Sequence, residues 1–482
     1  MVSNRLPWTD VAEDSSSTWR RSPAAWSARS PRRSWRNATA RGSAGTAPGR
    51  DPGAVRPRRL PPGSVTLSEL EVTRCYEGFS NATLAAVPRR DCTPEFHRTW
   101  WYAYRRVNER FARTAAETAA QGATVWVQDY QLQLVPRMLR RLRPDVTIGF
   151  FNHVRSLPPR SCSQLPWRRP CSTGSRARTS SASSVRGRPS PAVRRKYLGA
   201  QFTKGTAVMS EDAADARDRL DRARQSYPIS IDVGTPSRSC ADDPQVQARA
   251  RESAGARRPE PIFLGRGPLS LRRGIGTASR PTGGLLHDGG VAVEGSVLMQ
   301  VASPSRERVD SYRQLRELVE GMVGRINGQH DAIWHTAIRY LHRGYPFEEM
   351  VALYLAADVM LVTSAAGRDE PRGQGYVAAR RDRSGALVLS EFTGAAEQLK
   401  QAILVNPHDI DGLEEAILHA RDMPPTEARK RMASMRRQVL THDVVDWSQH
   451  FLDDLASTPA ARASRSTTPR GRVTLRERSR PW

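Results

Sequence analysis

The stretch TVWVQDYQLQLVPRMLRRLRPDVTIGFFNH, residues 124–153, has the pattern of a strand, a helix and a second strand. A short β-rich run occupies 124–127, a helical segment follows over 134–142, and another apolar run occupies 146–151. Strand–helix–strand units are the building blocks of parallel sheets. These residues therefore predict an α/β fold.

An amphipathic helix is predicted just before this unit. Thr93 is a suitable N-cap, and Pro94 fits the first turn of a helix. Apolar side chains then recur at helical spacing and give the helix one apolar face. Its members are Phe96, Trp100, Tyr104, Val107 and Phe111.

The second half of the chain repeats the alternation of strands and helices. A doubly wound sheet binds its ligands at the carboxyl ends of its strands, and two such domains that face each other form a cleft. The expected strands are 297–302, 338–341, 359–363, 386–389 and 403–405, and the expected helices are 309–326, 347–357 and 412–420. We expect two Rossmann-like domains, over 1–233 and 234–456, and a disordered basic tail over 457–482.

Several long stretches lack apolar periodicity and are expected to be degraded or disordered. They are 9–62, 155–195 and 234–290. Unstructured segments of that length are rare inside compact domains, so their number indicates that these segments are abnormal.

The net charge of +26 could favour nucleic acid, an anionic membrane or phosphorylated substrates. Nearly all of it is arginine, concentrated in segments without aromatic residues on a folded element, so nucleic acid is an unlikely partner. No apolar run is long enough to cross a bilayer, and the first residues lack a signal-peptide core, which predicts a cytoplasmic protein without a membrane partner. The five cysteines have no metal-ligand spacing, so no metal site is expected.

Four polar residues lie at predicted strand ends or helix starts. Asp129 and His153 follow consecutive strands and would reach one rim, where they could bind sugar hydroxyls. Arg5 and Arg306 follow strands and would suit an anion such as phosphate. By spacing alone, a capping aspartate, a loop histidine and solvated arginines explain these positions at least as well.

Eight short motifs follow one another along the chain: VSNRLP at 2–7, YEGFSNA at 76–82, WVQDYQL at 126–132, FFNH at 150–153, PISID at 228–232, SPSRE at 303–307, AADVMLVT at 356–363 and ALVLSEFTGAA at 386–396. Their order and approximate spacing resemble those of the trehalose-6-phosphate synthase family, from Val2 to about Leu455. The resemblance implies a GT-B fold with the active site between the domains, acceptor binding by 1–233 and nucleotide-sugar binding by 234–456.

The resemblance also implies an activity and a set of roles. Glucose would pass from a nucleotide-glucose, UDP-glucose in many members, to glucose 6-phosphate with retention, giving trehalose 6-phosphate without a metal or cofactor. Residues that match acceptor contacts are Arg5, Tyr76, Asp129 and Arg306. His153 matches a histidine near the transferred glucose, and Tyr345 matches an aromatic residue near the nucleotide.

The donor-site motifs depart from the family pattern. Gly367 and Gly375 replace an aspartate and a glutamate, Pro268 replaces an arginine, and Arg273 stands at the position of a lysine. Codons for the family motif Met-Asn-Leu-Val-Ala-Lys-Glu, read two bases out of frame, give the Glu-Pro-Arg-Gly-Gln-Gly found at 370–375. We interpret such segments as frame-damaged and expect the donor site to be weakened.

Three other functions fit parts of the pattern. A glucosylglycerol-phosphate synthase-like transferase would still need phosphate-binding arginines. A non-catalytic remnant would bind sugar phosphate without turnover. A nucleic-acid binder would use the positive charge, but the sequence contains no recognised binding module. The sequence is also compatible with a homo-oligomer.

Overall fold

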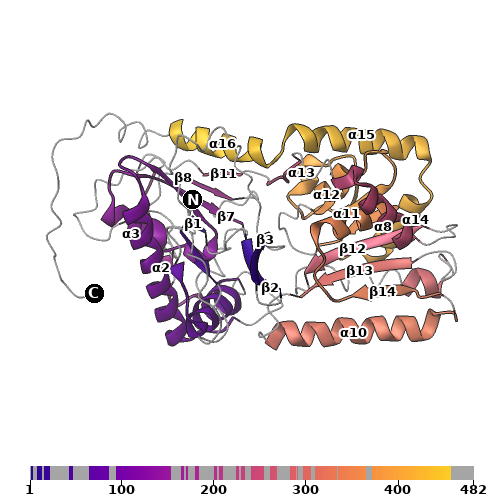
Figure 1. Ribbon diagram of the computed structural model, residues 1–482, viewed down its shortest axis with the longest axis horizontal. Coiled ribbons are helices and arrows are strands. Elements are labelled where there is room, and N and C mark those ends of the chain that lie inside the picture. The colour runs from indigo at the N-terminus through magenta and orange to yellow at the C-terminus, as the bar shows by residue number, and fades with distance from the viewer. Residues whose placement is uncertain are drawn as a thin grey trace.

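The computed structural model has two α/β lobes that lie side by side along the long axis of the molecule (Figure 1). The structure describes residues 2–3, 8–13, 16–21, 43–46, 65–85, 94–153, 164–167, 170–171, 180–183, 200–203, 206–209, 224–226, 229–233, 240–254, 261–268, 283–288, 290, 297–304, 310–333, 335–364 and 372–457. All statements below concern these residues.

A parallel sheet forms the centre of the N-terminal lobe. Its order among the described strands is β11-β8-β7-β6-β1-β4-β5. The bounds are Val2–Ser3 for β1, Ser43–Thr46 for β4, Val65–Thr66 for β5, Thr124–Gln128 for β6, Thr147–Asn152 for β7, Ser180–Ser183 for β8 and Arg224–Ser226 for β11. The first five residues of β7 are all buried, as expected for a parallel strand covered on both faces.

Helices of the N-terminal lobe pack beside this sheet. They are α1 at Glu69–Glu71, the π-helix η1 at Val72–Leu84, α2 at Arg98–Thr118, the short η2 at Tyr130–Leu132 and α3 at Val135–Leu142. Helix η1 lies against α2 so closely that a Cβ at Gly78 would be 2.5 Å from the Trp100 ring. Only glycine fits this contact.

The start of α2 differs from the sequence prediction. The helix begins at Arg98 with His97 at the N-cap, and Phe96 lies before it and is exposed. The preceding residues are held instead by hydrogen bonds to η1, where Glu95 N donates to Ala82 O over 3.3 Å. Tertiary contacts therefore outweigh the local helix signal of Pro94; Thr93 lies outside the described residues.

The C-terminal lobe contains a second parallel sheet of order β14-β13-β12-β15-β16-β17 among the described strands. Its strands are β12 at Ile262–Pro268, β13 at Val297–Ser303, β14 at Ile338–Leu341, β15 at Val359–Val362, β16 at Ala386–Ser390 and β17 at Ile403–Val405. Helices cover both faces, and Figure 1 shows α10 along one side of the lobe. They are α8 at Pro244–Ala254, α10 at Asp310–His330, α11 at Phe347–Ala356, α12 at Arg372–Ala379, α13 at Ala395–Gln398, α14 at Ile410–Arg421 and α15 at Pro425–Thr441.

Regular structure also lies in stretches that were expected to have none. The segment 234–290 contains α8 and the inner strand β12, which pairs with β13 and β15. Segment 155–195 contains β8. Segment 9–62 contains β4 and most of an antiparallel pair, β2 at Trp8–Glu13 with β3 at Ser16–Arg21. A second antiparallel pair joins β9 at Ala200–Thr203 to β10 at Thr206–Met209. The three stretches that were expected to be degraded or disordered therefore contain some regular structure, and the expected tail, 457–482, lies outside the described residues apart from Ser457.

The last helix, α16 at Val444–Ser457, leaves the C-terminal lobe and packs on the N-terminal sheet (Figure 1). Its apolar side chains form one buried cluster with residues of β6 and β7. The members are Trp126, Phe151, Ile229, Val444, Trp447, Phe451 and Leu455. A backbone hydrogen bond also ties the start of α16 to the segment 229–233, since Val444 N donates to Ile231 O over 2.9 Å.

Candidate functional site

Asp129 and His153 lie at the carboxyl ends of the neighbouring parallel strands β6 and β7. The two residues are in direct contact, because His153 N donates to Asp129 Oδ1 over 3.3 Å. Asp129 N also donates to Phe151 O over 2.7 Å, which extends the pairing of the two strands to the rim. Ligands of parallel α/β sheets bind at this edge.

Asp129 has a backbone conformation that is rare for a residue with a side chain. Its φ of 69° and ψ of 168° lie in a region that is sterically costly for any residue except glycine. Oδ1 accepts hydrogen bonds from Tyr130 N at 2.9 Å and from His153 N. Strain that persists at a strand end, held by such bonds, is typical of functional sites.

The His153 ring is held by two neighbours. Nε2 lies 3.0 Å from Gln128 Oε1, and because an amide oxygen only accepts, Nε2 is the donor in this hydrogen bond. The imidazole also packs on the Phe151 ring, with 4.8 Å between the centroids. Gln128 was not singled out from the sequence, because a glutamine inside a strand motif carries no signal of its own.

Tyr76 lies on helix η1 and is linked to the same rim through buried side chains. Asn81 Nδ2 donates to Tyr76 O over 2.7 Å, and Tyr130 OH donates to Asn81 Oδ1 over 2.9 Å. Asn81 and Tyr130 are both buried. The structure therefore brings Asp129 and His153 together, and it links the backbone of Tyr76 to the residue that follows Asp129.

Burial makes the groups beneath this rim chemically inert. Burial raises the pKa of the Cys75 thiol to about 12, and it also holds the pKa of the Tyr104 hydroxyl well above its usual range. Neither group is therefore available as a base or a nucleophile. No cluster of histidine, cysteine or carboxylate side chains suited to a metal ion occurs among the described residues.

In the C-terminal lobe the described candidates are Tyr345 and Gly375. Tyr345 is half-buried ahead of α11, and the Arg343 guanidinium lies 4.6 Å from its ring centroid. Gly375 lies inside α12, where a Cβ would be 3.3 Å from the Tyr354 ring. The structure does not bring these two residues into contact with the N-terminal rim. Arg5, Arg273, Arg306 and Gly367 lie outside the described residues.

Two arginines that sequence reasoning did not select lie at the carboxyl end of β12. Arg372, at the start of α12, donates from Nη1 to Arg266 O over 3.0 Å. The Arg266 side chain turns to α11, where it bonds Tyr354 OH and lies 5.6 Å from that ring centroid. Both residues belong to segments that depart from the family motifs, so motif comparison could not identify them.

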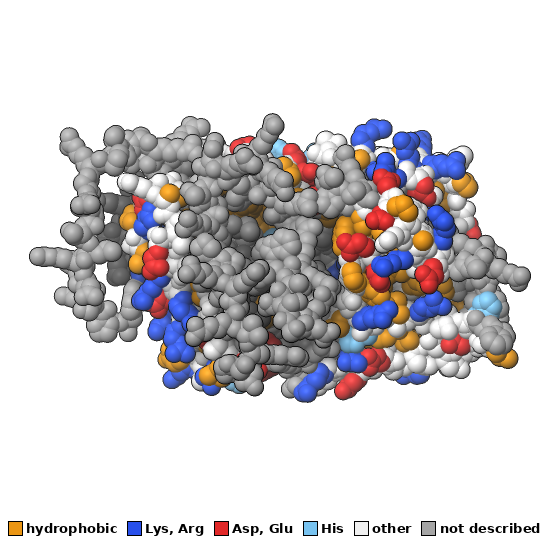
Figure 2. Space-filling view, viewed as in Figure 1, with side chains coloured by type: hydrophobic (Ala, Val, Ile, Leu, Met, Phe, Trp, Pro, Cys, Tyr) orange, Lys and Arg blue, Asp and Glu red, His pale blue; other side chains and the backbone are white. Residues whose placement is uncertain are grey.

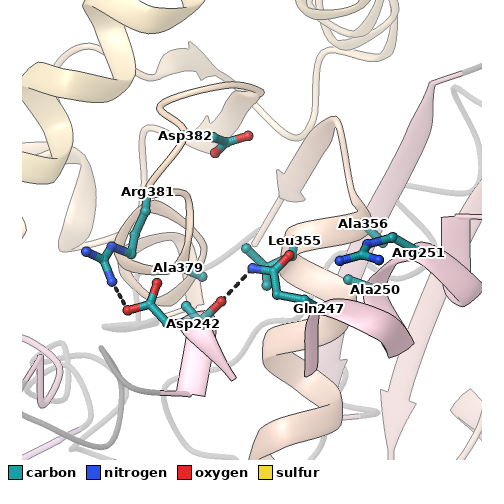
Figure 3. A pocket seen from close by; sticks show the side chains of 10 residues that line it. Asp242, Gln247, Ala250, Arg251, Leu355, Ala356, Ala379, Arg381 and Asp382 are labelled. Carbon is teal, nitrogen blue, oxygen red and sulfur yellow. Dashed lines mark hydrogen bonds and ion pairs between the residues drawn. The ribbon is translucent and has the colours of Figure 1, made fainter. Parts of the chain in front are cut away.

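A hollow of about 360 Å³ lies at the opposite edge of the C-terminal sheet (Figure 3). Its wall includes the ends of α11 and α12, where the chain turns into the amino ends of β15 and β16. In Figure 3 Arg381 points to Asp242, and the two form an ion pair. Because it lies away from the carboxyl ends of the strands, this hollow is separate from the candidate site.

Charge on the described surface is mixed. Figure 2 shows acidic and basic side chains interspersed over the described part of the C-terminal lobe. A continuous basic surface, which nucleic-acid binding would require, is not visible on that part of this face. None of the described helices combines the length and the apolarity needed to cross a bilayer.

Two α/β lobes, each with its own parallel sheet, and a last helix that crosses between them have the architecture of the GT-B fold. The model of glycosyltransferase family 20 matches residues 58–174 and 200–457, and the chain belongs to this family.

Relatives and solved structures agree with this assignment. The trehalose-6-phosphate synthase of Mycolicibacterium gilvum is 41% identical over 95% of this chain and 93% of its own length. The trehalose-6-phosphate synthase structure from Burkholderia multivorans is 26% identical, covers 98% of each chain and has a TM-score of 0.75. The Burkholderia xenovorans enzyme, solved in complex with glucose 6-phosphate, is 25% identical over 83% of this chain and 88% of its own, with a TM-score of 0.72.

Proposed function

We propose that this chain transfers glucose from a nucleotide-glucose, with UDP-glucose as the expected donor, to glucose 6-phosphate with retention of configuration. The product is trehalose 6-phosphate. The observation that carries the proposal is the hydrogen-bonded pair of Asp129 and His153 at the carboxyl ends of adjacent strands on this fold. A relative of the same fold was solved in complex with glucose 6-phosphate.

Within this proposal each rim residue has a chemical task. The Asp129 carboxylate accepts hydrogen bonds from hydroxyls of the acceptor sugar, and His153 lies next to the transferred glucose. The acceptor phosphate is bound by Arg5 and Arg306, since guanidinium groups suit phosphate oxygens. Tyr76 also binds this phosphate. Arg273 and Tyr345 bind the donor, and Gly367 and Gly375 take the positions of the two acidic donor contacts.

The reaction proposed here requires no metal ion or cofactor. Basic side chains and a helix N-terminus are sufficient to neutralise a departing diphosphate in a site that excludes water. Sugar phosphates and nucleotide sugars are cytoplasmic metabolites, so the proposal includes a cytoplasmic location.

The first experiment measures UDP release from UDP-glucose with and without glucose 6-phosphate, and the anomeric configuration of the product by NMR. We expect acceptor-dependent release with retention, at a low rate. Loss of one positioned charged group typically costs about 10²–10³ in rate, and Gly367 and Gly375 remove two. Asp129→Asn and His153→Ala should abolish the remaining turnover.

A matched variant tests the cause of the low rate. Gly367→Asp combined with Gly375→Glu restores both family carboxylates and should raise turnover by at least about tenfold, since one such group is worth about 10²–10³ in rate. The Tyr354 ring must shift by a few tenths of an ångström to admit a Cβ atom at 375. Turnover with glycerol 3-phosphate but not with glucose 6-phosphate would instead support the glucosylglycerol-phosphate synthase-like alternative. Glucose 6-phosphate binding without turnover in both forms would support the non-catalytic remnant.

A further inference from the structure

We propose that Asn81 is a positioning residue that fixes the spacing between the Tyr76 and Asp129 sides of the acceptor rim. The inference rests on the proposed function, because it assigns Asn81 to the acceptor half of that site. Asn81 itself is buried and 3% exposed, so it acts through the residues that it holds.

Asn81 joins two elements that are distant in the sequence. Its Nδ2 donates to Tyr76 O, one turn earlier in η1, over 2.7 Å. Its Oδ1 accepts from Tyr130 OH over 2.9 Å, across 49 positions of sequence. One planar amide thus fixes both the acceptor-side helix and the turn after β6, which apolar side chains could not do with the same directionality.

The turn that receives this contact is the one that carries Asp129. Tyr130 N donates to Asp129 Oδ1 over 2.9 Å, and Tyr130 O accepts from Tyr104 OH over 2.6 Å. The Tyr130 residue is therefore held at its hydroxyl, its carbonyl and its amide. These bonds limit rotation of the adjoining Asp129 side chain. Its Oδ1 accepts a second hydrogen bond, from the His153 backbone amide.

A second asparagine holds the next residues of the same turn. Asn108 Nδ2 donates to Gln131 O over 3.0 Å, and Leu134 N donates to Asn108 Oδ1 over 3.1 Å. The left-handed φ of Asp129 needs such surroundings, because a strained backbone persists only where neighbouring contacts determine it. Loss of the Asn81 contacts should let Asp129 relax and should misplace its carboxylate.

The chain offers a matched control for a purely structural asparagine. Asn327 on α10 joins β14 in the C-terminal lobe, donating from Nδ2 to Ile338 O and accepting from Ile338 N at Oδ1, both over 2.9 Å. It makes two amide hydrogen bonds, as Asn81 does, but lies in the other lobe. Asn327→Leu should therefore lower stability without changing acceptor binding.

The test compares the full-length chain with Asn81→Leu, Tyr130→Phe and Asn327→Leu. Titration calorimetry with glucose 6-phosphate should give a dissociation constant about tenfold higher for Asn81→Leu, because one lost positioning interaction of ordinary strength corresponds to about that factor. Tyr130→Phe should give a smaller increase in the same direction. Affinity for UDP should stay unchanged in both variants.

Amide hydrogen exchange is the second measurement, and it requires no ligand. Asn81→Leu should raise the exchange rates of the amides at 130–134, whereas Asn327→Leu should raise those around Ile338. Equal glucose 6-phosphate affinities of Asn81→Leu and Asn327→Leu, or unchanged exchange at 130–134, would overturn the proposal. If the wild type binds no glucose 6-phosphate, the proposed function fails, and the exchange rates alone decide whether Asn81 holds the turn of Asp129.

Discussion

Arg143 joins the end of helix α2 to the strand that carries His153. Its guanidinium donates from Nη1 to Ala116 O and Ala119 O, each over 2.8 Å, and from Nη2 to Ala120 O over 2.9 Å. These carbonyls lie at the end of a helix, where backbone acceptors lack intrahelical partners. The same guanidinium forms a two-pronged pair with Asp145, with both distances 2.8 Å, just before β7.

The hydrogen bonds from Arg143 hold the pKa of Asp145 at about 2. A carboxylate whose pKa is lower in the folded state stabilises the fold above its unfolded pKa, and this benefit disappears as the pH falls through the folded value. Asp145→Asn should lower the free energy of unfolding at pH 7 by about 1 kcal/mol, because the partly exposed pair is screened by solvent. Urea unfolding at several pH values measures this.

The pH dependence is the decisive part of that measurement. The difference between wild type and Asp145→Asn should be constant from pH 7 to about 5, shrink below about pH 4 and reach its minimum only below about pH 2. A difference that stays constant down to pH 3 would contradict a role for the charge of Asp145. Glu109→Gln, which alters an exposed pair with Arg113 on the same helix, is the control and should have little effect at any pH.

Single residues also show what the sequence could predict about the candidate site. Asp129 and His153 could be predicted as candidate site residues because each follows a strand with a clear apolar pattern. Asn81 was not, because a buried polar residue inside a helix has no distinctive spacing, and its partner Tyr130 lies 49 positions away. The positive φ of Asp129 depends on the same tertiary hydrogen bonds, so the sequence did not predict it either.

At the scale of elements, β12 shows the limit of periodicity. Its residues, IFLGRGP at 262–268, include two glycines, an arginine and a proline, which weaken a strand signal. The strand nevertheless pairs along its length with β13 and over three residues with β15. The position of β12 between two strongly apolar strands outweighs its low strand propensity. A local sequence pattern could not show that position. Strands with continuous apolar runs, such as β7, β15 and β16, lie within about a residue of their expected bounds.

Helix α16 depends on aromatic contacts with the opposite lobe. Phe451 stacks on Trp126 with 4.5 Å between ring centroids, and Trp447 meets the Phe151 ring edge-on at 4.9 Å. A Cβ at Gly149 would lie 2.8 Å from Leu455 Cδ2 and 2.9 Å from Phe451 Cε1, so a larger residue at 149 would force side chains of α16 to shift. Phe151 also contacts the His153 ring, which places this interface next to the site.

Phe451→Ala should therefore destabilise the protein strongly. Removal of a fully buried phenylalanine costs about 3–5 kcal/mol, because the cavity adds to the lost transfer free energy. Phe347→Ala is the matched control, because Phe347 is 47% exposed at the start of α11 and its truncation should cost less than about 0.5 kcal/mol. Thermal and urea unfolding of both variants provide the comparison. Similar losses in the two variants would show that α16 does not hold the lobes together.

For the whole molecule, each lobe has its own core, and described residues of the two lobes contact each other. One core comprises η1, α2 and the N-terminal sheet, and separate cores flank the C-terminal sheet. Besides the α16 cluster, the buried Gln374 donates from Nε2 to Ile229 O over 3.2 Å. The doubly wound architecture of both lobes followed from the sequence, but these links did not, because they join residues far apart in the chain.

Two cysteines make the separate opening of the lobes measurable. Cys75 is buried in the N-terminal core, and burial raises its pKa to about 12. Cys240, at the edge of the C-terminal core, is half-buried, and desolvation raises its pKa to about 11. The thiolate is the reactive form, so in the native protein at pH 8 Cys75 should be labelled by a maleimide at least about tenfold more slowly than Cys240.

The same labelling in Phe451→Ala tests how the lobes are coupled. Loss of the α16 contact weakens the N-terminal sheet at β6 and β7. Local opening follows the element that is destabilised, so labelling of Cys75 should accelerate. Labelling of Cys240 should stay close to the wild-type rate. Mass spectrometry of the labelled peptides separates the two thiols, and Phe347→Ala serves as the control. Equal acceleration at both cysteines would mean that the two lobes unfold as one cooperative unit. The contacts between the lobes would then transmit the whole loss of stability.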